Sequence, residues 1–121
     1  MTAEPSVQAT DTSGTSLIMQ LSGDMDYETA PFFRERLLDE MAGGQRRLVL
    51  DLTAVSFCDS AGLNVLLWAW RQADQAGTVL VLACVPPKVQ RMLNMTGADT
   101  LVTVYGTVAE AGDELVADGG V

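Results

Sequence analysis

Two patterns of apolar residues alternate along the chain. Short runs that are apolar almost throughout are typical of strands in a sheet covered on both faces; they lie at residues 15–21, 48–52, 79–85 and 101–105. Between them, apolar residues recur three and four positions apart, as on the buried face of a helix; such helices are expected at residues 26–41, 63–73 and 107–116, and from Pro86-Pro87 to just before Gly97. The first strand should end in a turn at Ser22-Gly23. This alternation predicts an α/β domain with right-handed crossovers.

The length and the two ends of the chain predict one folded unit. With 121 residues, 48% of them hydrophobic, the chain can bury one core but is short for two domains. We expect a single domain over residues 14–116, between loose polar tails at residues 1–13 and 117–121. No secretory signal is visible at the start, and the longest apolar run, residues 79–85, is far too short for a membrane span. The sequence therefore predicts a cytoplasmic protein.

Charge and rare residue types narrow the classes of function. A net charge of −9 disfavours nucleic acid and anionic membrane, since both are bound by faces of lysine and arginine; the acidity could equally serve solubility alone. The chain has no histidine, which removes the commonest general base and the usual zinc ligand. Cys58 and Cys84 lack a metal-ligand spacing, and we expect both thiols to be reduced. No metal site, cofactor or enzymatic activity is expected.

One short stretch, SFCDSAGL at residues 56–63, joins a predicted strand to a predicted helix. Its Ser60 could cap the helix, because a serine oxygen can accept from the free amides of a first turn. It could instead accept a phosphoryl group, which free amides and the positive end of the helix dipole tolerate. A hydrolase nucleophile is a poor reading, since neither the G-x-S-x-G elbow nor a histidine is present. The cap and the phosphorylation site both stay open on these residues.

Three blocks of sequence resemble bacterial anti-anti-sigma factors, the STAS-domain antagonists of anti-sigma factors. They are GDMDYETA at residues 23–30, LVLDLTAVSFCDSAGL at residues 48–63, and PKVQRMLNMTGAD at residues 87–99. Their order and spacing match the family over residues 15–115, essentially the whole predicted fold. The resemblance implies the STAS fold: a mixed, mostly parallel sheet of four to five strands, with about four helices packed mainly on one side.

The resemblance also implies a partner-switching mechanism. In this family the unphosphorylated protein binds an anti-sigma factor that is also a serine kinase, and thereby frees the sigma factor. The kinase phosphorylates the serine after the motif aspartate, which releases the antagonist, and a serine phosphatase of the metal-dependent class resets the switch. The matching acceptor is Ser60, preceded by Asp59, while Asp24 and Asp26 match the acidic positions of the family's nearby turn. The implied role is transcription regulation by a phosphoprotein.

Two departures from the family pattern and one helix face complete the predicted site. Ala61 stands where many members carry a second hydroxyl residue, and Asn64 where glycine is frequent. Projected at about 100° per residue, the helix places Trp68 away from its expected core stripe, so it could anchor a partner or pack under a neighbouring element. The expected partner-binding residues are Asp24, Asp26, Asp59, Ala61, Gly62, Asn64, Val65 and Trp68.

A rival interpretation comes from a different class of protein. A STAS module can be a fixed subunit or scaffold of a larger assembly, such as a transport or stress-sensing complex, and there Ser60 could be only a cap. Phosphorylation by a purified kinase separates the two hypotheses.

Overall fold

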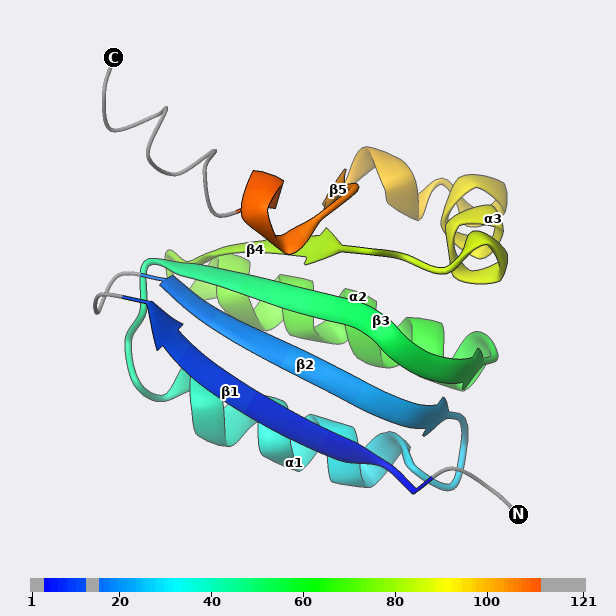
Figure 1. Ribbon diagram of the computed structural model, residues 1–121, viewed down its shortest axis with the longest axis horizontal. Helices are drawn as coiled ribbons and strands as arrows, with labels where there is room; N and C mark the ends of the chain where they lie inside the picture. Colours follow the sequence, from blue (N-terminus) through cyan, green and yellow to red (C-terminus); the bar gives the residue numbers. More distant parts are fainter. Residues whose placement is uncertain (1–3, 13–15, 112–121) are drawn as a thin grey trace.

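The computed structural model describes residues 4–12 and 16–111, and its centre is one five-stranded sheet (Figure 1). The strands follow one another in the order β1-β2-β3-β4-β5. β1 pairs antiparallel with β2, and every later pair is parallel, so the expected mixed, mostly parallel sheet is confirmed. The strands are β1 Ser6–Thr12, β2 Ser16–Met25, β3 Arg47–Cys58, β4 Val79–Ala83 and β5 Thr103–Tyr105.

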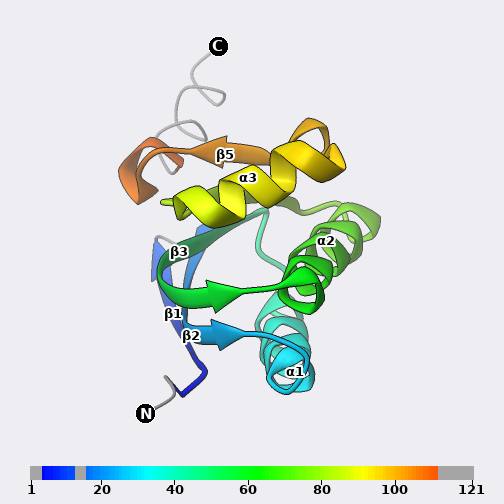
Figure 2. The ribbon, with the colours of Figure 1, turned by 90° about the vertical axis from the view of Figure 1, so that its right-hand side faces the viewer.

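Helices connect the parallel strands. Figure 2 shows α1 and α2 side by side on one face of the sheet, with α3 beyond the upper edge of that layer. A short 3₁₀ turn, η1 Ala98–Thr100, follows α3, and residues 108–111 are helical as well. The rest of the helix expected over residues 107–116, like the tail expected at 117–121, lies outside the described residues. The three longer helices are α1 Ala30–Met41, α2 Ser60–Gln75 and α3 Pro87–Thr96.

Burial explains why the central strands read as unbroken apolar runs. Along β3, Leu48 and Leu50 face the main core under α1 and α2, whereas Val49 faces a smaller cluster on the opposite side. That smaller cluster also contains Val81 of β4 and Ala111 of the last helical segment. Both faces are therefore covered where β3 and β4 pair, which removes the polar alternation of a half-exposed sheet.

The prediction of a loose tail at residues 1–13 is wrong for Ser6–Thr12, which form strand β1. This strand pairs with β2 from Ser6↔Ser22 to Thr12↔Ser16. An edge strand needs few apolar residues: Val7 is buried against the core while Gln8 is exposed. The main chain of β2, the next strand along the chain, supplies the pairing, whereas the side chains of this stretch give only a weak apolar signal.

Two strands are longer than expected, and this difference builds the site. The predicted turn at Ser22-Gly23 is wrong, since β2 continues to Met25. Gly23 instead has a φ of 92°, and the register of β2 against β3 shifts between Gly23 and Asp24, as at a β-bulge. β3 likewise continues to Cys58 and so carries the chain directly to Ser60.

Candidate functional site

The start of α2 is capped by Asp59, the residue before Ser60. One Asp59 carboxylate oxygen accepts from the amide of Ala61 at 2.9 Å and from that of Gly62 at 3.1 Å. Asp59 has extended backbone, as an N-cap residue requires. Ser60 is the first helical residue and is exposed, and no hydrogen bond of its hydroxyl occurs within residues 4–12 and 16–111. The capping role therefore belongs to Asp59, and it leaves the hydroxyl of the exposed Ser60 without a hydrogen bond in the described part of the chain.

The chain turns between β2 and α1 beside this helix start. Asp26 Oδ1 accepts from the amides of Glu28 and Thr29, at 3.0 Å each. The Thr29 hydroxyl in turn accepts from the amide of Asp26 at 2.9 Å and donates to the carbonyl of Asp24 at 2.8 Å. These bonds fix the turn, and they give the predicted acidic residue Asp26 a structural role in addition to its charge.

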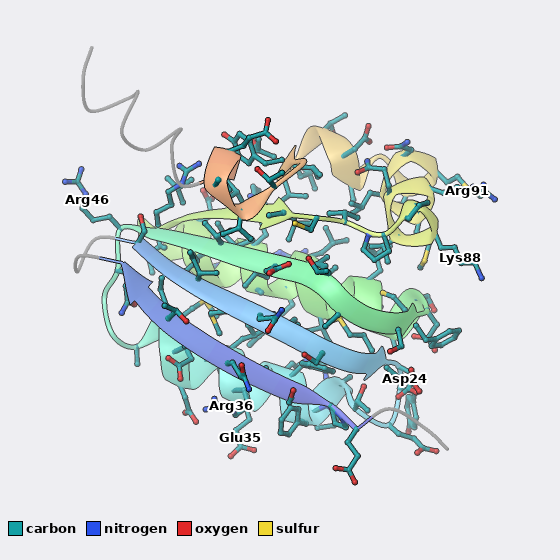
Figure 3. All side chains as sticks on the ribbon, in the orientation of Figure 1. Asp24, Glu35, Arg36, Arg46, Lys88 and Arg91 are labelled. Atoms are coloured by element: carbon teal, nitrogen blue, oxygen red, sulfur yellow. The ribbon has the colours of Figure 1, made fainter. Side chains whose placement is uncertain are left out.

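Sheet register brings the acidic turn and the serine together. Asp24 pairs with Phe57, and Met25 pairs with Cys58, so β2 and β3 end side by side. The amide of Asp59 continues this pairing by donating to the carbonyl of Met25 at 3.2 Å. Figure 3 shows Asp24 at this end of the sheet. Asp24 and Asp59 therefore lie at adjacent strand ends, near the Ser60 turn.

Gly62 allows α2 to start against the end of β2. A methyl group placed on Gly62 would lie 2.4 Å from the Met25 carbonyl oxygen and 2.9 Å from Cys58 Sγ. Both distances are well inside van der Waals contact. Gly62 is buried, so its part in the site is to permit this approach and not to contact a partner with a side chain.

The face of α2 differs in part from the predicted one. Asn64 is exposed and Ala61 half-buried, in line with a partner-facing position. Val65 has an exposed fraction of 0%, so the prediction that it contacts a partner is wrong. Its side chain belongs to the main core because α2 packs on both the sheet and α1. Trp68 is half-buried against that core, which leaves part of its ring on the surface.

Two exposed aromatic residues at the site were missed by the sequence analysis. Tyr27, in the turn after Asp26, has an exposed fraction of 82%, and Phe57, at the end of β3, one of 52%. Tyr27 borders an open groove of about 550 Å³ that separates the turn and the start of α1 from α2. Ala61 and Asn64 form its other wall, and Arg34 is its cation. Large aromatic side chains exposed at such a rim are typical anchors of protein interfaces.

Cys58, the last residue of β3, has a thiol of low reactivity. Burial, and secondly the charge of Asp59, raise the pKa of its thiol from an ordinary value of 9.0 to about 11. Its Sγ also donates to the carbonyl of Asp59 at 3.6 Å. A thiol is a nucleophile only as the thiolate, so at neutral pH Cys58 acts as a packing group.

Within residues 4–12 and 16–111, no group of three or more cysteine, aspartate or glutamate side chains is arranged to hold a metal ion. Over the same residues, none of the helices combines the length and the apolar character needed to cross a bilayer.

Comparison with known proteins places the chain in a family. The sequence profile of the STAS domain matches residues 6–111. The anti-sigma F factor antagonist of Paenibacillus polymyxa is 32% identical over 100 residues, which cover 82% of this chain and 86% of that protein. The crystal structure of an anti-sigma factor antagonist from Mycobacterium paratuberculosis superposes with a TM-score of 0.82 at 25% identity, over 92% of this chain and 93% of that one. The Bacillus cell-fate determinant SpoIIAA in its phosphorylated form has the same fold, with a TM-score of 0.71 at 18% identity and coverages of 91% and 99%.

Proposed function

The chain belongs to the STAS domain family and is related to the anti-sigma factor antagonists, and from that premise we propose that it is itself such an antagonist, switched by phosphorylation of Ser60. In the proposed cycle, the unphosphorylated protein binds an anti-sigma factor that is a serine kinase and so frees the sigma factor. The kinase then phosphorylates Ser60, and the antagonist dissociates. A serine phosphatase of the metal-dependent class restores the binding form.

This proposal rests on the observation that Asp59, and not Ser60, caps α2. Asp59 supplies the helix cap, so the Ser60 hydroxyl is exposed and has no structural hydrogen bond among the described residues. In the transfer, Ser60 Oγ forms a bond to the γ-phosphorus of ATP while the bond to the bridging oxygen breaks and ADP leaves. The hydroxyl proton passes to a base supplied by the kinase.

Charge explains how one phosphate would release the partner. A phosphoserine carries about −1.5 to −2 at neutral pH. It would join three carboxylates near the same surface, those of Asp24, Asp26 and Asp59. Docking of the kinase would then have to desolvate the phosphate beside these carboxylates, against their mutual repulsion. We expect this to cost roughly 2–4 kcal/mol of binding free energy, which corresponds to a loss of affinity of about 30- to 1000-fold. The partner surface formed by these residues with Ala61, Asn64 and Trp68 is part of the proposal.

The proposed setting follows from the same mechanism. The protein acts as a non-enzymatic regulator in the cytoplasm, needs no cofactor of its own, and binds neither nucleic acid nor membrane. ATP is a substrate of the kinase partner. Residues 14–116, together with strand β1, form the single domain that carries the function.

The test is phosphorylation of the purified protein by candidate anti-sigma kinases from its own genome, read by intact mass and peptide mapping. We expect one phosphate, on Ser60, and none in Ser60→Ala. Ser56→Ala is the matched control, because Ser56 is also an exposed serine of this stretch and its loss should leave the phosphate in place. Ser60→Asp should weaken kinase binding, whereas Ser60→Ala should bind without release.

Failure of this test has a defined meaning. Tight binding of Ser60→Asp to a kinase that phosphorylates the native protein would contradict the charge mechanism. If no candidate kinase modifies the folded protein, a fixed role as a subunit or scaffold of a larger assembly becomes the better interpretation.

A further inference from the structure

Strand β3 extends past the end of β4 and leaves an edge without a strand partner. Pairing of β3 with β4 stops at Asp51↔Ala83, whereas β3 continues to Cys58. On its other side the extension stays paired with β2 as far as Met25↔Cys58. Within residues 4–12 and 16–111, no strand pairs with residues 52–58 on the β4 side.

The chain leaves β4 in a way that prevents it from covering this edge. Cys84 follows the strand with a φ of 56°, a left-handed conformation that ends extended pairing. After Val85, Pro86 and Pro87 open α3. Proline has no amide hydrogen, so this segment cannot replace the missing ladder. Ladder positions along the end of β3 are thus left for another chain.

An open groove lies along this edge. Residues 55–58 of β3 form one wall, and residues 86–89 at the start of α3 form the other, around a volume of about 400 Å³. Most of the lining is apolar, and the Phe57 ring, half-exposed, stands at its rim. We call this the edge groove.

Positive charge gathers beside the edge groove in an otherwise acidic protein. Residues 84–98 contain two cations, Lys88 and Arg91, and no carboxylate, whereas the whole chain has 7 cations against 16 acids. Lys88 lines the groove itself. Figure 3 shows Lys88 and Arg91 projecting outward from the same side of α3. In the described part of the chain the one ion pair joins Arg36 and Glu40, so neither cation of α3 is neutralised there.

We propose that the edge groove binds an extended, acidic segment of a partner protein by strand addition to β3. The main chain of that segment would supply the hydrogen bonds that β4 does not provide, its apolar side chains would contact Phe57 and Pro87, and its carboxylates would pair with Lys88 and Arg91. A free strand edge selects an extended peptide, an apolar lining selects alternate apolar side chains, and the two cations select negative charge. This binding does not use Ser60 and goes beyond the phosphorylation switch.

The test is a titration of the ¹⁵N-labelled full-length protein with the capped peptide Glu-Val-Asp-Val-Glu-Val-Asp, followed by amide chemical shifts. We expect saturable shifts at residues 55–58 and 86–91. The same peptide N-methylated at alternate residues cannot complete a ladder and should bind at least about tenfold more weakly. The variant Lys88→Glu/Arg91→Glu should also lose about tenfold or more. Arg46→Glu/Arg71→Glu, which changes the net charge equally at exposed positions away from the groove, should stay within about threefold.

Each opposite result overturns the proposal. Equal binding of the N-methylated peptide would reduce the groove to an anion site without strand addition. Equal binding of a peptide with lysine in place of its acids would remove the role of Lys88 and Arg91. Absence of chemical-shift changes in the edge groove would exclude a peptide partner. Shifts there that depend on protein concentration without peptide would also exclude one, and would indicate that a second copy of this chain occupies the groove. Ser60→Ala must bind the peptide as the native protein does, which separates this outcome from that of the kinase experiment.

Discussion

Replacement of Gly62 by alanine tests the close approach that positions Ser60. In an unobstructed helix this change would stabilise the protein by about 1 kcal/mol, because alanine has a higher helix propensity. Here the new methyl group would stand 2.4 Å from the Met25 carbonyl oxygen and 2.8 Å from its Cβ. The obstacle is backbone, so α2 or the end of β2 must shift by roughly 1 Å to restore normal contact. Overpacking of this kind costs about 1–3 kcal/mol.

Set against the gain in helix propensity, this cost leaves a net loss of stability of up to about 2 kcal/mol, seen as a fall in Tm of up to about 8 °C. Phosphorylation of Ser60 should slow as well, because the first turn of α2 moves with Gly62. The matched control is Asn64→Ala, an exposed position of the same helix, where propensity alone predicts a gain of a few tenths of a kcal/mol. A Gly62→Ala protein stabilised by the roughly 1 kcal/mol that helix propensity alone predicts would refute the close approach.

Three other perturbations test separate contacts. Asp59→Ala should cost about 1 kcal/mol in urea unfolding by removing the cap of α2, while Asp59→Asn should cost much less; equal losses would contradict the cap. The pKa of Cys58, raised to about 11, means that unfolding releases its proton between about pH 9 and 11, so stability should fall there relative to Cys58→Ser; a pH-independent difference would disprove it. Arg47→Met should remove the 3.0 Å hydrogen bond to the Ala111 carbonyl and lower the free energy of unfolding by about 1.5–3 kcal/mol, with faster hydrogen exchange at residues 108–111. Unchanged exchange there would argue against this contact.

The hydrogen bond from Arg47 to the Ala111 carbonyl is a contact that no local sequence pattern predicts. Arg47 is buried at the start of β3, with its guanidinium 5.9 Å from the ring centre of Tyr105. It ties the last described helical segment to the sheet across more than half the chain. In the sequence it is one arginine beside another, at a site where an exposed residue would be the ordinary expectation.

The order of strands and helices was determined by the sequence, because apolar periodicity reflects the local geometry of each element. The runs within β3 and β4 and the stripe of α1 needed no knowledge of their partners. The Asp59-Ser60 pair was also visible, since helix starts have a narrow choice of residues. Which of the two caps the helix was not visible, because aspartate and serine are nearly equal in that role.

Tertiary structure alone decided the remaining features, all of which depend on pairing or packing with another element. Strand β1 exists because β2 offers it a ladder, although most of its own residues are polar. Val65 is buried because α2 packs on both the sheet and the neighbouring α1, so its covered stripe is wider than a single-faced projection allows. The free edge of β3 arises because β4 ends at Ala83 while β2 continues to Met25. Such differences in strand length follow from the assembled sheet, since periodicity within one segment does not report where its neighbours stop.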